Sequence, residues 1–191
     1  MPTKPKILKR DYAGGSRLFK AEELYLQFSN GEERLYERLI SGGHGAVMVV
    51  PVTEDNQLIL IREYAAGTED YPWSLPKGAI DKGEDKFTAA NRELQEEAGF
   101  KAEELIFLKW LSLSPSYMGH GIEVILARGL TLSRLVGDEP EPIETMTWPL
   151  DDITGLIMRE DFHEGRAVAA LFLAQKFLEN EYKYKDENQS E

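Results

Sequence analysis

Three glutamates in the middle of the chain, Glu93, Glu96 and Glu97, have a spacing that gathers carboxylates on one side of a helix. At about 100° per residue, Glu97 lies roughly 40° from Glu93 on one side and Glu96 roughly 60° on the other. Like charges at this spacing destabilise a helix by about 0.2–0.5 kcal/mol per pair. A divalent cation would offset that repulsion, because hard ions prefer oxygen ligands in fixed positions. The competing interpretation is an ordinary solvated acidic face.

A helix over residues 85–98 is needed to hold these carboxylates together. Apolar residues recur in the sector beside the glutamates, and this pattern predicts a face packed against the core. The apolar positions are Phe87, Ala90, Leu94 and Ala98.

The remaining sequence predicts a layered domain of strands and helices. Alternating apolar residues on either side of Asn30-Gly31 predict strand, turn and strand over residues 17–40. We interpret residues 1–43 as a small β appendage and predict an α/β or α+β domain after it. Further strands are expected at 46–52, 58–64, 105–114 and 121–128 and near Pro149, with a last helix at 164–182 and a disordered tail at 185–191.

Composition excludes several classes of protein. The chain has 191 residues and a net charge of -12, from 22 basic and 34 acidic residues. This balance disfavours binding to long nucleic acids, which depends on basic residues that replace counterions. No apolar run approaches the roughly 18 residues that span a bilayer, and no apolar segment follows the basic N-terminus as in a secretory signal. The absence of cysteine from the sequence fits a cytoplasmic protein.

The acidic helix lies within a longer pattern, G-x5-E-x7-R-E-U-x-E-E-x-G-U, where U is a bulky apolar residue. The sequence fills every fixed position of this pattern and so resembles the Nudix box. The matching residues are Gly78, Glu84, Arg92, Glu93, Leu94, Glu96, Glu97, Gly99 and Phe100.

The resemblance implies an α/β/α sandwich around a mixed sheet over residues 44–184, and hydrolysis of a pyrophosphate bond in a small nucleotide. It implies Mg²⁺ as the cofactor, with Mn²⁺ as the alternative. By position, Glu93 and Glu97 would be the main metal ligands, and Glu96 would bind a further ion or its waters. The carbonyl of Lys77 would supply another oxygen. Arg92 would orient the glutamates.

A general base outside the box often completes the reaction in this family. The acidic loop at residues 138–142 is the matching segment here, with Glu141 as the first candidate and Glu139 as the second. The alternative for both residues is a flexible acidic loop without a catalytic role.

The position of Pro115, 15 residues after the last position of the box, resembles the ADP-ribose branch of the family. This resemblance implies ADP-ribose, NADH and diadenosine polyphosphates as substrates, and AMP plus a second phosphorylated fragment as products. Pro115, Ser116 and Tyr117 would form a wall of the substrate site, and Arg62 would contact phosphate or ribose. Lys77 departs from the branch pattern and implies a shifted substrate range, or it is an ordinary surface lysine.

In this branch the N-terminal hairpin is typically exchanged across a homodimer, so we expect a homodimer here. Arg38 and an aromatic residue, Phe19 or Tyr36, would then hold the adenine, although strand aromatics more often belong to a core. Two other functions stay open. One is a different Nudix specificity, for a sugar nucleotide or a nucleoside triphosphate, and the other is a catalytically silent nucleotide-binding regulator.

Overall fold

The computed structural model describes residues 2–16, 19–40, 43–138 and 140–188. The chain divides into two compact units. The N-terminal unit comprises Met1–Gly45 with Ser112–Gly121, and the main unit comprises Ala46–Leu111 with Ile122–Glu191.

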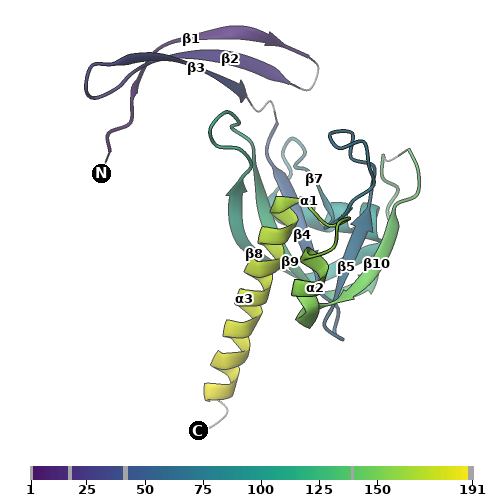
Figure 1. Ribbon diagram of the computed structural model, residues 1–191. Coiled ribbons are helices and arrows are strands. Elements are labelled where there is room, and N and C mark those ends of the chain that lie inside the picture. The colour runs from purple at the N-terminus through teal and green to yellow at the C-terminus, as the bar shows by residue number, and fades with distance from the viewer. Residues whose placement is uncertain (1, 17–18, 41–42, 139, 189–191) are drawn as a thin grey trace. The chain divides into compact units, whose positions relative to one another are not determined.

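The N-terminal unit is built on an antiparallel sheet with the strand order β1-β2-β3 (Figure 1). Its strands are β1 (Lys6–Gly15), β2 (Lys20–Gln27) and β3 (Glu33–Ile40). The predicted strand, turn and strand are confirmed, and Gly31 adopts the positive φ of 86° that the turn requires. The sequence analysis did not predict β1, because its residues are mostly exposed and show no regular apolar alternation.

The segment 112–121 packs on this small sheet. The backbone N–H of Leu39 donates to the carbonyl of Tyr117 at 2.7 Å, and Leu39 pairs with Met118 in a parallel bridge. The residues of the expected substrate wall, Pro115, Ser116 and Tyr117, therefore belong to the N-terminal unit.

The main unit contains a four-stranded sheet, β7-β4-β9-β8, and a three-stranded sheet, β10-β5-β6. Strand β4 runs parallel to β9 and antiparallel to β7, which makes the larger sheet mixed. The strands are β4 (Ala46–Pro51), β5 (Gln57–Arg62), β6 (Trp73–Ser74), β7 (Lys77–Ala79), β8 (Phe100–Ser112), β9 (Gly121–Leu132) and β10 (Glu144–Pro149).

The predicted helix at 85–98 forms, but its last part is wound differently. The carboxylate of Asp85 accepts bonds from the N–H groups of Phe87 and Thr88 and so starts α1 (Lys86–Glu93). A π-helical segment, η1 (Leu94–Ala98), then continues to Gly99, whose φ is 78°. A π-helical turn widens the spacing between residues, and such turns are frequent at functional sites.

The C-terminal helices are α2 (Ile153–Ile157), which follows the short 3₁₀ turn η2 (Leu150–Asp152), and α3 (Gly165–Asn188). Helix α3 was expected to end near residue 182, and it continues into the segment at 185–191 that was predicted to be a tail. Residues 189–191 lie outside the described residues. In the described part of the chain, no helix is long and apolar enough to span a bilayer.

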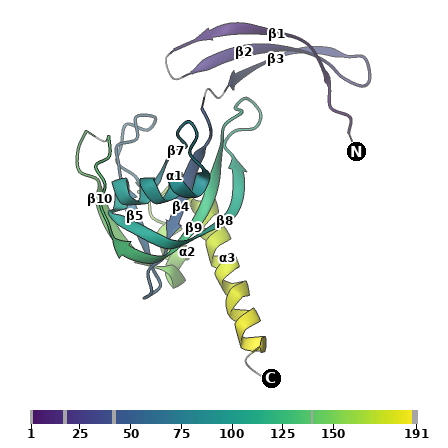
Figure 2. The same ribbon diagram turned by 180° about the vertical axis from the view of Figure 1, so that it is seen from behind.

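Alternation along β4 divides the core into two layers. Met48 and Val50 pack in a cluster that includes Leu171 of α3. Val47 and Val49 pack on the opposite side, in a cluster that includes Ala90 and Leu94. Helices α1 and α3 accordingly lie on opposite faces of the sheet (Figures 1 and 2), which is the predicted α/β/α sandwich.

Candidate active site

A polar cavity of about 650 Å³ lies in the main unit beside the acidic helix. It collects residues from the chain segment directly after β5, from β7, from the α1–η1 helix and from the first turn of α3. Acidic side chains outnumber basic ones in its lining. The acidic residues are Glu63, Asp81, Glu93, Glu96, Glu97 and Asp138, and the basic residues are Lys77, Arg92 and Arg166.

Arg92 is the centre of the hydrogen-bond network in this cavity. Its Nη1 donates to Glu93 at 2.7 Å and to Glu96 at 3.0 Å, while Nε and Nη2 each donate to Glu84 at 3.0 Å. Nη2 also donates to the carbonyl of Ala79. The bonds from Arg92 hold the pKa of Glu84 below its usual range. One guanidinium therefore bonds to three carboxylates.

Glu97 is buried on the other side of the network, with 3% of its surface exposed. Its carboxylate accepts a hydrogen bond of 2.8 Å from the backbone N–H of Lys77. Burial raises the pKa of Glu97 to about 8, although the charge of Lys77 and the bond from its N–H oppose the change. The Nζ of Lys77 pairs with Glu63 at 3.3 Å. Lys77 thus contributes to the site with both its backbone and its side chain.

Gly78 allows β7 to approach the helix closely. A Cβ atom at this position would overlap the carboxylate of Glu93, a side chain group that flexes but is held here by Arg92. The lack of a side chain, rather than a positive φ, is therefore the reason for a glycine at this position.

The oxygen-rich lining is suited to a hard divalent cation. Glu93 and Glu97 are buried, with 7% and 3% of their surfaces exposed, at the edge of a polar cavity rather than within the apolar core. Within the described residues, no three acidic or histidine side chains are already grouped around one point as metal ligands. Oxygens of Glu93, Glu96 and Glu97 accept bonds from Arg92 and from the Lys77 N–H.

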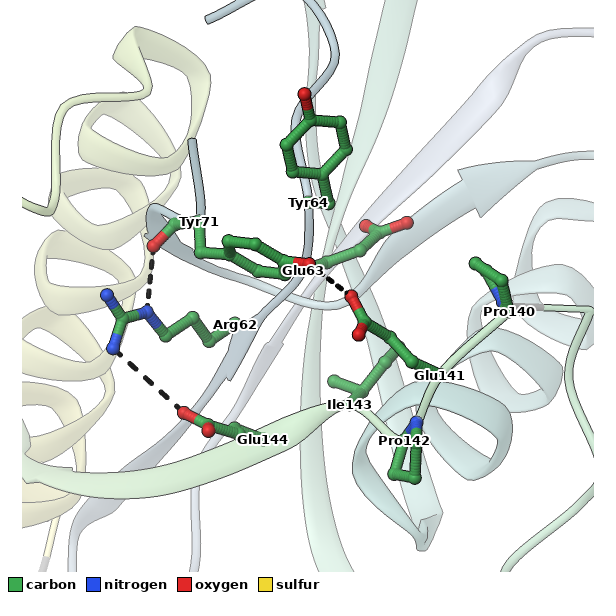
Figure 3. Close-up of a pocket in the computed structure, with 9 residues that line it drawn as sticks. All are labelled: Arg62, Glu63, Tyr64, Tyr71, Pro140, Glu141, Pro142, Ile143 and Glu144. Atoms are coloured by element: carbon green, nitrogen blue, oxygen red, sulfur yellow. Dashed lines mark hydrogen bonds and ion pairs between the residues drawn. The ribbon is translucent and has the colours of Figure 1, made fainter. Parts of the chain in front are cut away.

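A second cavity of about 460 Å³ lies at the end of β5 (Figure 3). Arg62 donates from Nε to the carbonyl of Tyr71 at 2.8 Å. The hydroxyl of Tyr71 donates to Glu141 at 2.5 Å, so the carboxylate points toward the tyrosine. Glu63 lines both this cavity and the polar cavity. The first candidate base therefore lies in the neighbouring cavity, and Glu139 lies outside the described residues.

The other expected substrate residues belong to the N-terminal unit. Arg38 is ion-paired with Glu22 across β2 and β3. Phe19 and Tyr36 are both exposed, at 49% and 45%. Pro115, Ser116 and Tyr117 lie in the segment that packs on β3.

Four charged residues that line the polar cavity were not selected from the sequence: Glu63, Asp81, Asp138 and Arg166. Glu63 directly follows Arg62 at the end of a strand, which was a usable signal. Arg166 is separated from the helix motif by more than 60 residues, and nothing in its local sequence indicated the cavity.

Comparison with known proteins decides the family. The NUDIX domain model matches residues 42–171. The chain belongs to the Nudix family. A second model, for the NudE-type Nudix hydrolase N-terminal domain, matches residues 5–38, so the Nudix relationship extends to the N-terminal sheet.

Curated Nudix relatives cover most of the chain. ADP compounds hydrolase NudE of Escherichia coli (strain K12) is 48% identical over 178 residues, which are 93% of this chain and 95% of that protein. An ADP-ribose pyrophosphatase of Bacillus subtilis (strain 168) is 29% identical over 129 residues, 66% of this chain and 70% of that protein.

A solved crystal structure of an ADP compounds hydrolase has a similar fold. It superposes with a TM-score of 0.88 at 46% identity and covers 95% of this chain and 97% of that chain. The predicted fold class is therefore confirmed. Nudix hydrolases generally depend on a divalent metal ion, which agrees with the oxygen-rich lining of the polar cavity.

Proposed function

We propose that this Nudix enzyme hydrolyses the pyrophosphate bond of ADP-linked compounds, namely ADP-ribose, NADH and diadenosine polyphosphates. The products would be AMP and a second phosphorylated fragment. The observation that carries the proposal is the pair of buried carboxylates, Glu93 and Glu97, held beside a polar cavity by Arg92 and the Lys77 N–H. The similarity to two relatives, an ADP compounds hydrolase and an ADP-ribose pyrophosphatase, supports the choice of substrate class.

Mg²⁺ is the proposed cofactor, with Mn²⁺ as its alternative, because carboxylate and carbonyl oxygens suit both ions. Glu93, Glu97, Glu96 and the carbonyl of Lys77 would hold it. When bound, the cation would offset charge on the phosphates and lower the pKa of an attacking water. Arg92 would keep Glu93 and Glu96 in position, and Lys77 would keep Glu97 in position through its N–H.

Glu141 is the proposed general base, and Glu139 is the alternative. For Glu141 to accept a proton from water in the polar cavity, its bond to Tyr71 must break and the loop must turn from the neighbouring cavity. Glu63 lines both cavities, so the two spaces adjoin.

Substrate selection would involve residues of both units. Arg62 would contact phosphate or ribose through its donors, and Lys77 would contact phosphate. From the N-terminal unit, Arg38 would contact the adenine and Pro115, Ser116 and Tyr117 would form a wall. A homodimer that exchanges the N-terminal strands, and a cytoplasmic location, stay predictions.

The experiment that tests the function is a substrate panel with purified protein and Mg²⁺. We expect AMP from ADP-ribose, NADH and diadenosine triphosphate, and little turnover of GDP-mannose or ATP. Cleavage of ATP or GDP-mannose with inert ADP-ribose would replace the proposal with a different Nudix specificity. Binding of ADP-ribose without turnover of any compound would replace it with a nucleotide-binding regulator.

A further inference from the structure

Three basic side chains line the polar cavity, and they differ in how their donors are used. Every nitrogen of the Arg92 guanidinium donates to a carboxylate or carbonyl oxygen, and the Nζ of Lys77 pairs with Glu63. Arg166 pairs with Glu164 through Nη2, but its Nε is buried and has no hydrogen-bond partner among the described residues. Arg166 therefore keeps a donor that the protein leaves unsatisfied.

Two other residues fix the guanidinium of Arg166 in place. The hydroxyl of Ser74 in β6 donates to Oε2 of Glu164 at 2.7 Å. Oε1 of the same carboxylate is ion-paired with Arg166, although this oxygen, like the Nε of Arg166, is buried without a hydrogen bond among the described residues. Arg166 lies in the first turn of α3, and the next residue, Ala167, is completely buried in the core. The side chain, 29% exposed, is thus oriented before any ligand arrives.

A buried donor without a partner costs free energy, and a ligand that supplies the missing acceptor removes this cost. The planar guanidinium suits phosphate oxygens, to which it can donate two parallel bonds. The cavity also needs positive charge to accept an anion, because its acidic residues outnumber its basic ones. The unsatisfied donor, the planar guanidinium and the acidic lining together indicate a phosphate group as the ligand.

We propose that Arg166 binds the pyrophosphate group of the substrate, with Ser74 and Glu164 as its positioning residues. This inference rests on the proposed function, because it places the scissile diphosphate in the polar cavity. It adds to the reaction a phosphate-binding residue that comes from the C-terminal helix rather than from the Nudix box.

Binding of α,β-methylene ADP-ribose in the presence of Mg²⁺, measured by calorimetry, tests the proposal. We expect Arg166→Ala to weaken binding at least about tenfold, and Arg166→Lys to recover part of the affinity because it restores the charge without the planar donors. Arg128→Ala is the matched control. Arg128 is also a partly buried arginine (24% exposed) that is ion-paired to α3, through Glu181, but it does not line the polar cavity.

A parallel titration with inorganic pyrophosphate and Mg²⁺ separates the two proposals. If wild-type protein binds pyrophosphate through Arg166 but hydrolyses no ADP-linked compound, the proposed function fails and the role of Arg166 stands. If wild-type protein hydrolyses ADP-ribose and Arg166→Ala retains wild-type affinity for both ligands, the role of Arg166 is wrong. Two outcomes would instead assign Arg166 to the stability of α3. One is an equal loss of affinity in Arg128→Ala, and the other is a lower melting temperature in Arg166→Ala but not in Arg128→Ala.

Discussion

The backbone N–H of Lys77 donates to the carboxylate of Glu97 at 2.8 Å, which ties the strand before the helix to the end of the helix. Both elements contribute to the polar cavity. The bond fixes a buried carboxylate whose charge is disfavoured by its surroundings.

The raised pKa of Glu97 predicts how stability changes with pH in the presence of a chelator. Its pKa is about 8 in the folded protein, against an ordinary value of 4.5. Between these two values the folded state holds a proton that the unfolded state has released. The free energy of unfolding should therefore fall as pH rises, by at most about 1.4 kcal/mol per pH unit.

Glu97→Gln isolates this contribution, because glutamine does not titrate. Urea denaturation with EDTA, at several pH values from about 5 to 8, should give a shallower pH dependence for the variant than for the wild type. Parallel curves for the two proteins would mean that Glu97 is ionised throughout the range.

Gly78→Ala should impair the metal site without unfolding the protein. The added Cβ would overlap the carboxylate of Glu93, which must then leave its bond to Arg92. We expect weaker activation by Mg²⁺, with the Mg²⁺ concentration for half-maximal activity raised about tenfold or more. Changes of residues that hold metal ligands in position typically have an effect of this size. Gly67→Ala is the matched control, because nothing lies within 4 Å of a Cβ at Gly67. Equal activation of both variants would contradict the packing argument.

Arg92→Ala should destabilise the protein, because it leaves three carboxylates near one another without the guanidinium group that pairs with them. The side chain is 25% exposed, and removal of one partner from a largely buried ion pair costs about 3 kcal/mol. Since a divalent cation would replace part of the missing charge, millimolar Mg²⁺ should recover more stability in the variant than in the wild type. Chemical denaturation with and without Mg²⁺ measures both effects. A loss that Mg²⁺ leaves unchanged would argue against a cation beside these carboxylates.

Glu141→Gln should lower kcat for ADP-ribose about 100-fold, with a small change in KM, if Glu141 accepts the proton from water. Glu160→Gln, a change at an exposed glutamate outside both cavities, is the control. An unchanged kcat in Glu141→Gln would leave Glu139 as the candidate base in the acidic loop.

The sequence predicted the parts of the fold that depend on local pattern. The alternating apolar strands, the Asn30-Gly31 turn and the acidic helix are found where the pattern placed them. Strand β1 was missed because it buries little apolar surface and so leaves no periodic signal. The π-helical turn after Glu93 was missed because helical periodicity assumes an even rotation per residue.

Only the part of the candidate site that lies within one helix could be predicted, because sequence spacing reveals local proximity alone. Arg92, Glu93 and Glu97 share one helix, so their spacing revealed their proximity. Glu164 and Arg166 are two residues apart, but Ser74 is brought to Glu164 only by packing of the chain around α3 on the sheet. Distances of this kind depend on tertiary structure, and no local pattern contains them.

The most direct test of the account is the position of a divalent ion in crystals of the wild-type protein soaked with Mn²⁺ and α,β-methylene ADP-ribose. We expect an anomalous peak in contact with the carboxylates of Glu93 and Glu97, and its loss in Glu97→Gln. A well-ordered analogue bound with no such peak beside these two residues would contradict it.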